Sequence, residues 1–600
     1  MNRKFTRTLL VIVFAGFCFM AAAQQASEPQ AATPTIRVTT HLVLVNVIAT
    51  DRAGKPVTDL KPEDFTVEDN GKKQKLSVFN LQQPVAQSYR PQLPPNVYSN
   101  RPQFGMPAGP LTVLLVDGLN TPFTNQSQAR LALIKYAANQ VKAGQEVAIY
   151  ALGYRLYRLQ DFTNDPAVLR AAVESYSPEN LPEHGSTLAP SRVTSNAGVA
   201  DTGARGGTAT AAVLATAIQN IQQFQSEQAG AALQLRIAAT LAAMRSLSRE
   251  LAGHPGRKNL VWVTAGFPVS LIAQTNEVTY LNDRSADPTA PPPLASEQTY
   301  GAFNQGVLQE SADEVRRTSS LLSQAQISIY PVDARGLLGA SNADARDAGL
   351  DTSGRLMLGN DFGQTVSAAG ALRESTQASM QDLADQTGGR VFKNRNDIDN
   401  CVAAAASDGD TYYALGYYPD KKKFDNSFHK LKLSVNRPGV QLRYRAGYYA
   451  VDPAKESRKE RDMEMAAALH DNTVEATMVM FDARIVPPPP ADKATVPVQF
   501  LVQPDSISTE EAKNGGRALN LDFYVAAFTP QGKLAGNSGK TVSATLSSDQ
   551  YAQVQQKGLL LPIDIKLPPG TYNLRLAVRD NRTGYLGTIG VPLTLPAPGK

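Results

Sequence analysis

The sequence predicts an α/β fold with a doubly wound, mostly parallel sheet, a flanking β module and a C-terminal immunoglobulin-like β-sandwich. Two short apolar runs, 111–117 and 259–264, end abruptly in small and polar residues. Strands buried on both faces of a parallel sheet have this pattern. Between 111 and 407 such runs alternate with helical patterns, which is typical of an open parallel sheet. From 494 onward, alternating strand patterns separated by turns predict the sandwich.

Length and charge limit the classes of protein to consider. A chain of 600 residues is too long for one core, so about three or four domains are expected. The net charge falls from +5 to +2 when Arg3, Lys4 and Arg7 are left out, because these three lie in a leader. A balance so close to neutral excludes the electrostatic footprint of a nucleic-acid-binding protein.

The first 23 residues have the pattern of a signal peptide. Basic residues precede an apolar run over 9–20, and Ala21, Ala22 and Ala23 form a small-residue cleavage site. The apolar run is short for a membrane span, so a retained anchor is the alternative. No later segment is apolar enough to span a membrane, which predicts no integral membrane segment after cleavage. Export to the periplasm or to the outside is therefore expected.

Strand and turn signals divide the rest of the chain. Residues 24–34 form a flexible linker, 35–83 an N-terminal β module with a hairpin at Asn70-Gly71, and 84–110 a proline-rich linker. The α/β domain follows over 111–407, with loose insertions at 176–207, 270–300 and 336–366. Residues 408–450 pair with 35–83 or extend the α/β domain. A charged helical linker over 451–473 leads to the sandwich over 474–600.

Several motifs resemble those of the VWFA-related proteins, von Willebrand factor A-like (VWA-like) chains of the acidobacterial type. They are VTDLKPEDF at 57–65, DGLNT at 117–121, GRKNLVW at 256–262, YPVDARG at 330–336, YYALGY at 412–417 and RAGYY at 445–449. The resemblance covers about 35–450. It implies a VWA-like core and an export route, and it implies no particular activity.

The same resemblance implies a metal-ion-dependent adhesion site in degenerate form. Asp117 stands at its first acidic position, Thr121 at its second hydroxyl position, and Thr208 at the ligand position of the second loop. Leu119 replaces the first hydroxyl, and Ala265 replaces the last acid. No cofactor is therefore expected, and a divalent cation, Mg²⁺ or Ca²⁺, is the alternative.

Open parallel sheets bind their ligands at the carboxyl ends of the strands. We therefore expect an unknown protein partner at the residues that we call the rim: Asp117, Asn120, Thr121, Thr264 and Asp333. The predicted function is that of an exported protein-binding, adhesion or envelope-assembly protein. A secreted hydrolase with an unrecognised site and a structural envelope component are the alternatives.

The remaining motifs do not predict an enzyme. The chain has five histidines, of which no two have metal-ligand spacing, and it has no Gly-x-Ser-x-Gly elbow. Residues 536–541 (GNSGKT) resemble a phosphate loop only in part, and a hairpin turn is expected there. Cys401 is the single cysteine outside the leader, and its place in a helical pattern predicts a buried, inert thiol. The Tyr-rich strands 411–418 and 444–449 fit a binding surface or ordinary sheet packing.

Overall fold

The computed structural model describes most of the chain beyond the predicted leader. The described residues are 42–83, 92–101, 104, 111–142, 144–177, 231–232, 234–266, 312–337, 360–419, 426–451, 457–470, 474–489, 492, 494–512 and 515–596, with 124, 312–313, 360–372, 375 and 460 described by their backbone alone. The predicted signal peptide and linker at 1–34, Thr208, and most of the three predicted insertions lie outside these residues. No described helix combines the length and apolar character that a membrane crossing needs.

One mixed sheet forms the centre of the α/β part. Its strands are β6 (Leu111–Asp117), β7 (Glu146–Leu152), β8 (Leu156–Thr163), β9 (Lys258–Thr264) and β10 (Ile327–Asp333), in the order β10-β9-β6-β7-β8. The first four strands of this order pair in parallel, and β8 pairs antiparallel with β7. Only residues 153–155 connect β7 to β8, and a parallel crossover needs a dozen residues or more, so this pair has to be antiparallel.

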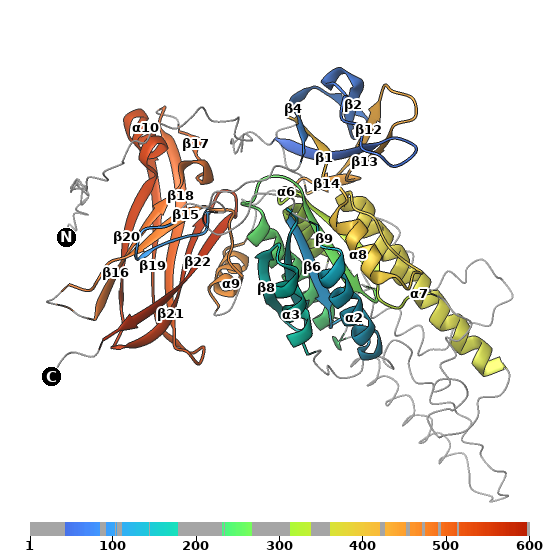
Figure 1. Cartoon of the computed structure of the whole chain (residues 1–600). Helices are drawn as coiled ribbons and strands as arrows, with labels where there is room; N and C mark the ends of the chain where they lie inside the picture. Colours follow the sequence, from blue (N-terminus) through green and yellow to red (C-terminus); the bar gives the residue numbers. More distant parts are fainter. Residues whose placement is uncertain are drawn as a thin grey trace, which may run out of the picture. The chain divides into compact units, whose positions relative to one another are not determined.

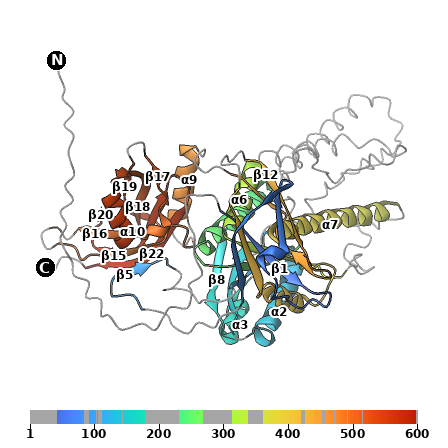
Figure 2. The same ribbon diagram turned by 90° about the horizontal axis from the view of Figure 1, so that it is seen from above.

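Helices pack on both faces of this sheet (Figure 1, Figure 2). One face carries α2 (Phe123–Asn139), α3 (Pro166–Ser175) and α8 (Ile398–Ala406). The other carries helical residues 234–251, α6 (Ala312–Gln324) and the last turns of α7 (Asn360–Thr387). Because both faces are covered, every residue of β6, β7, β9 and β10 is buried. Cys401 is a buried free thiol on α8, and its pKa is raised to about 11 by burial.

The small β module has two antiparallel sheets around one core. The first sheet contains β1 (Val43–Thr50), β4 (Leu76–Gln82), β11 (Tyr412–Tyr417) and β13 (Gln441–Arg443). The second contains β2 (Phe65–Asp69), β3 (Lys72–Gln74), β12 (Phe428–Val435) and β14 (Gly447–Tyr449), and a 3-10 turn, η1 (Pro62–Asp64), leads into β2. Strands from the two flanks of the α/β part therefore share both sheets. All the tyrosines in β11 and β14 are buried, as ordinary sheet packing requires.

The C-terminal part is a sandwich of two antiparallel sheets around a third core. One sheet contains β5 (Val97–Ser99), β15 (Phe481–Ile485), β16 (Thr495–Val502) and β20 (Leu559–Lys566). The other contains β17 (Glu510–Glu511), β18 (Arg517–Phe528), β21 (Gly570–Asp580) and β22 (Leu586–Leu595), with β19 (Leu534–Leu546) paired to β18. Three short helical elements accompany them: α9 (Arg458–Leu469), η4 (Pro504–Ser506) and α10 (Ser548–Lys557).

The predicted fold class was wrong for the chain. Four of the five sheets among the described residues are wholly antiparallel, and the fifth is mixed rather than doubly wound and parallel in the VWA-like manner. The prediction gave residues 111–407 a doubly wound, mostly parallel sheet, whereas the one sheet of this segment is mixed and carries an antiparallel edge strand, β8. Most of the strands lie in the flanking β module and in the sandwich, where hairpins and meanders favour antiparallel pairing.

Two local predictions were also wrong. Residues 536–541, expected as a hairpin turn, lie within the long strand β19, where Thr541 pairs with Asp522. The proline-rich segment 84–110, expected as a spacer alone, contains β5, which pairs with β15 at the edge of a sandwich sheet. The partner of β5 is distant in sequence, whereas β19 pairs with the strand just before it, and its Gly- and Ser-rich composition masked the strand.

Candidate functional site

The rim lies where three neighbouring parallel strands end. Asp117, Thr264 and Asp333 are the last residues of β6, β9 and β10. Asp333 is paired directly with Thr264, and Ala334 continues the contact by donating its N–H to the Thr264 carbonyl at 2.9 Å. Since parallel strands end at the same edge of a sheet, the register brings all three side chains to one place.

Asp117 is the more enclosed of the two rim carboxylates, with 1% of its surface exposed. Its Oδ1 accepts the backbone N–H of Asn120 at 2.8 Å. Its Oδ2 accepts three side-chain donors: Asn120 Nδ2 at 3.0 Å, Trp262 Nε1 at 2.9 Å and Thr264 Oγ1 at 2.8 Å. Burial raises the pKa of Asp117, and these hydrogen bonds oppose that shift. The carboxyl group is therefore held by neutral donors in a site that disfavours its charge.

Asn120 links Asp117 to the helical segment 234–251. Its Nδ2 also donates to Thr240 Oγ1 at 3.0 Å, and its Oδ1 accepts both Nε and an Nη of Arg236 at 3.2 Å. Asn120, Thr240 and Arg236 are all buried. The Asn120 side-chain amide thus lies between the Arg236 guanidinium and the Asp117 carboxylate and is hydrogen-bonded to both.

Thr121 joins the ends of β6 and β9 by another route. Its Oγ1 accepts the backbone N–H of Ala265 at 3.1 Å, and its carbonyl accepts Nε2 of Gln126 at 2.7 Å. Leu119, between Asp117 and Thr121, is fully buried in the core beneath the sheet end. The Thr121 hydroxyl, expected as a metal ligand, is therefore bonded to the backbone of Ala265, which stands where the last acid of the metal site was expected.

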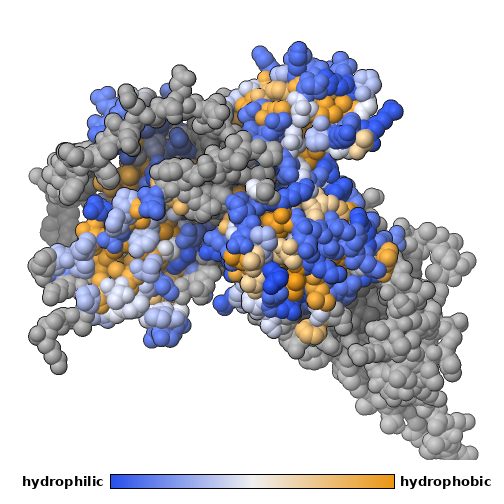
Figure 3. All heavy atoms as spheres, viewed as in Figure 1, coloured by the Kyte–Doolittle hydropathy of each residue, from blue (hydrophilic) through white to orange (hydrophobic). Residues whose placement is uncertain are grey.

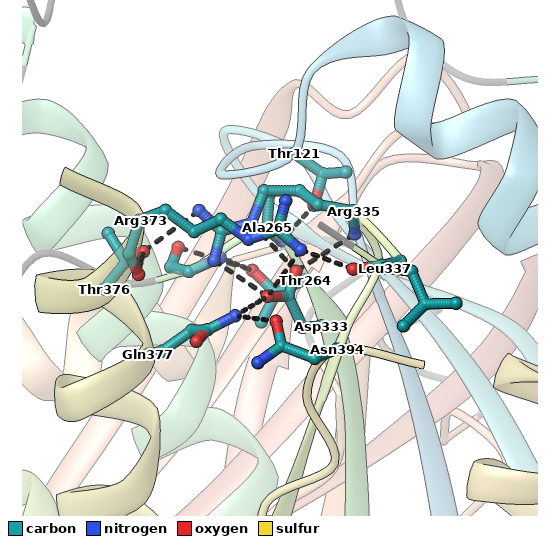
Figure 4. A network of polar contacts seen from close by, with 12 residues as sticks. Thr121, Thr264, Ala265, Asp333, Arg335, Leu337, Arg373, Thr376, Gln377 and Asn394 are labelled. Carbon is teal, nitrogen blue, oxygen red and sulfur yellow. Dashed lines mark hydrogen bonds and ion pairs between the residues drawn. The ribbon is translucent and has the colours of Figure 1, made fainter. Parts of the chain in front are cut away.

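Asp333 anchors a second network, drawn in Figure 4. Its Oδ1 accepts the backbone N–H of Arg335 at 3.0 Å and Arg335 Nε at 2.8 Å, and its Oδ2 accepts an Nη of Arg335 at 2.9 Å. Gln377 Nε2, on α7, also donates to Oδ2 at 2.8 Å. A second guanidinium, that of Arg373 on α7, lies 3.9 Å from the same oxygen. Asp333 is thus enclosed by one bidentate arginine, one amide and one further arginine.

The structure brings the predicted rim residues to one edge of the sheet but divides them into two networks. Asp117, Asn120 and Thr264 are in direct hydrogen-bond contact, and Thr121 joins them through Ala265. Asp333 adjoins Thr264 along the backbone, and its carboxylate faces α7 instead. All five rim side chains are buried. Thr208, the remaining metal-ligand candidate, lies outside the described residues, and those residues contain no cluster of three or more His, Cys, Asp or Glu suited to a metal.

Sequence reasoning missed the arginines of this site. Arg335 follows Asp333 by two residues in the motif 330–336, and that short spacing is a signal that was available. Arg236, Arg373 and Gln377 come from helices distant in sequence, and no local pattern marks them. Trp262 was placed in the strand correctly, but its indole N–H as a partner of Asp117 follows only from the register of β6 with β9.

Exposed apolar side chains lie on the segments that follow or adjoin the buried rim residues. Phe123 follows the end of β6, Tyr154 the end of β7 and Leu337 the end of β10, while Leu235 precedes Arg236. Their exposed fractions are 48% for Phe123, 47% for Tyr154, 61% for Leu235 and 55% for Leu337. The carboxyl edge of the sheet therefore combines a rigid polar interior with accessible apolar groups.

Comparison with known proteins leaves the family open. No family model matches the chain, and no curated protein matches it. Among solved structures, a beta-glucuronidase from glycoside hydrolase family 2 is 10% identical over 31% of this chain, with a TM-score of 0.13, and the match spans 17% of that enzyme. The three N-terminal domains of the type V pili tip protein Mfa5 from Porphyromonas gingivalis are 9% identical over 88% of this chain and 78% of theirs, with a TM-score of 0.22. At such TM-scores neither likeness carries an argument about fold or function.

Proposed function

We propose that the protein is an exported protein-binding protein, acting in adhesion or envelope assembly, and that it binds its partner at the carboxyl edge of the mixed sheet. The observation that carries this proposal is the set of exposed apolar side chains around the rim: Phe123, Tyr154, Leu235 and Leu337. Accessible apolar groups grouped at one site are typical of interaction surfaces.

The buried rim supports the same proposal as a scaffold. Four hydrogen bonds fix Asp117, and a bidentate arginine fixes Asp333, so the loops that leave β6 and β10 start from rigid points. Binding residues commonly lie on loops that a rigid framework positions. Hydrophobic and hydrophilic residues are interspersed over the face in Figure 3, and single exposed apolar residues are normal on any surface. It is the placement of these four residues that supports the assignment.

A charge placed on the exposed apolar residues tests the partner surface. Leu337→Asp and Phe123→Asp should each reduce capture of the partner from an envelope fraction, quantified by mass spectrometry. The control is Leu131→Asp, since Leu131 is equally exposed on α2 and lies further along that helix. If Leu337→Asp and Phe123→Asp both capture the same proteins as the unmodified chain, the partner surface lies elsewhere.

Export has its own test. The predicted cleavage after Ala23 would leave a mature chain that begins at Gln24. N-terminal sequencing of the protein recovered from the periplasmic and extracellular fractions should find Gln24. A chain recovered from the membrane with residues 1–23 intact would indicate the retained anchor instead.

No described feature of the rim favours the hydrolase alternative, which polysaccharide and peptide activity panels address directly.

A further inference from the structure

We infer that the carboxyl edge of the mixed sheet binds a carboxylate group of its partner, an Asp or Glu side chain, through Arg335 and Arg373. The inference rests on the proposed function, because it names the chemistry by which the partner is recognised. It also gives a role to the two guanidinium groups that lie next to Asp333 and that the hydrogen-bond network does not fully neutralise.

The first step is the local charge. Arg335 and Arg373 both lie against Asp333, at 2.8 Å and 3.9 Å, and Asp333 is the only carboxylate in ionic contact with either among the described residues. Two guanidinium groups on one carboxylate leave one positive charge. The nearby ion pair of Arg395 with Asp397 is internally neutral, and Glu374, the neighbour of Arg373, is exposed.

The second step is the number of donors that remain. Arg335 uses three of its N–H groups, two toward Asp333 and one toward Thr376 Oγ1 at 3.0 Å, so two of its N–H groups remain. Arg373 donates from one Nη to the Gly336 carbonyl, and its Nε has no hydrogen-bond partner although it is buried. An unpaired buried donor carries a desolvation penalty, which an added acceptor relieves when the side chain adjusts to meet it.

The third step is accessibility. The Arg335 side chain is 17% exposed and that of Arg373 is 9% exposed, whereas Asp333 is fully enclosed. An anion arriving from solvent therefore meets the two guanidinium groups before the carboxylate. Burial lowers the pKa of Arg373, and the neighbouring Arg335 lowers it further, in opposition to Asp333. A second anion near the pair would relieve this repulsion.

The fourth step is the identity of the anion. The planar donor fork of a guanidinium matches the two oxygens of a carboxylate. Leu337, two residues after Arg335, is 55% exposed and presents an apolar surface beside the pair. An acidic side chain flanked by apolar residues satisfies both features, which favours an acidic peptide segment over a free inorganic anion.

Titration of the full-length protein with a defined peptide pair tests the inference. The probes are acetyl-Leu-Glu-Leu-amide and its neutral counterpart acetyl-Leu-Gln-Leu-amide, followed by isothermal calorimetry and by the Nε resonances of ¹⁵N-arginine-labelled protein. The Glu peptide should bind saturably, at least tenfold more tightly than the Gln peptide, and shift two arginine resonances. Arg335→Gln and Arg373→Gln should each remove that tenfold preference, and Arg335→Lys, which keeps the charge without the fork, should weaken it.

Arg170→Gln is the control, because Arg170 is an exposed arginine on α3 paired with Glu174. Equal binding of the two peptides, or a preference that survives in both Arg335→Gln and Arg335→Lys, would overturn the inference. Tighter binding of inorganic phosphate than of the Glu peptide would overturn its carboxylate chemistry. If Leu337→Asp loses partner capture but the unmodified protein does not bind the Glu peptide, the inference is wrong and the proposed function stands. If the protein binds the Glu peptide but Leu337→Asp and Phe123→Asp still capture the partner, the proposed function is wrong instead.

Discussion

At the scale of single residues, Asp117 is a buried hydrogen-bond acceptor that holds four donors on its two carboxylate oxygens. Asp117→Ala would leave the indole N–H of Trp262, the hydroxyl of Thr264 and the Asn120 amide without their acceptor. Each unsatisfied buried group costs about 1–3 kcal/mol, and relief of a buried charge offsets part of the total. We expect the free energy of unfolding to fall by about 3 kcal/mol.

Trp262 is the single tryptophan of the chain, so its fluorescence in urea titrations reports directly on this site. Asp564→Ala, at an exposed position of β20, is the matched control and should change the free energy of unfolding very little. A loss no larger than that of the control would show that the four donors find other partners.

Glu250 gives a pH-dependent prediction at the same scale. Its Oε1 accepts Tyr150 at 2.7 Å and Arg158 at 3.4 Å, its Oε2 has no partner, and burial raises its pKa to about 7. A carboxyl group whose pKa is raised in the folded state contributes stability that is present below its unfolded pKa, near 4.5, and is lost as the pH rises to 7.

Glu250→Gln keeps an acceptor for Tyr150 and abolishes the titration. The variant should therefore gain on the unmodified protein between pH 4.5 and pH 8, by up to about 3 kcal/mol in unfolding free energy. Chemical denaturation of both proteins at several pH values measures the difference, in which all other titrating groups cancel. A constant gap across this range would contradict the raised pKa.

At the scale of elements, β5 is the strand that joins the N-terminal half of the chain to the sandwich. Asn100, just after β5, donates from Nδ2 to the carbonyls of Ala476 and Val479, and its Oδ1 accepts the N–H of Phe481 at 2.9 Å. The next residue, Arg101, forms a bidentate pair with Asp482. These bonds hold residues 97–101 along the edge of β15.

Asn100→Ala should therefore loosen this edge while leaving the rest of the sandwich folded. The Val479 carbonyl and the Phe481 N–H would lose their bonds to the Asn100 side chain, and the Ala476 carbonyl would keep only the Thr588 N–H. We expect a loss of about 2–4 kcal/mol with faster amide exchange in β5 and β15. Hydrogen exchange followed by mass spectrometry measures it, with Asn537→Ala on the exposed face of β19 as the control. Unchanged exchange in β15 would show that Asn100 is dispensable for the edge.

The elements show where sequence reasoning succeeds. The strand over 111–117 has the predicted bounds and the one over 259–264 begins one residue earlier, because a continuous apolar run bounded by polar residues needs no knowledge of its partners. The hairpin at Asn70-Gly71 follows from the positive φ of both residues, 48° and 78°. Sequence reasoning fails for β5 and for 536–541, where pairing with β15 and with β18, respectively, decides the structure. Local composition favours a spacer at β5 and a turn at 536–541, and strand pairing overrides it in both places.

At the scale of the whole molecule, the same limit explains the incorrect fold class. The βα alternation between 111 and 407 is visible in the sequence, but the antiparallel pairing of β8 with β7 depends on the three-residue connection between them and not on the composition of either strand. The rim shows the limit at a functional site. Three strand ends predicted the positions of Asp117, Thr264 and Asp333, whereas Arg373 and Gln377 became part of the site only through the packing of α7.

The last prediction concerns metal binding by the intact protein. A cation at Asp117 would have to displace three donors from Oδ2, and Thr121 Oγ1 is already bonded to the Ala265 N–H. The next carboxylate, Asp333, is neutralised by Arg335, so the charge that attracts a hard cation is absent. Calorimetric titration with Mg²⁺, Ca²⁺ and Mn²⁺ should show no micromolar binding, and a chelator should leave the melting temperature unchanged. Saturable micromolar heat that Asp117→Asn abolishes would contradict this, because the isosteric amide keeps the shape of the site and removes only the charge that a cation needs.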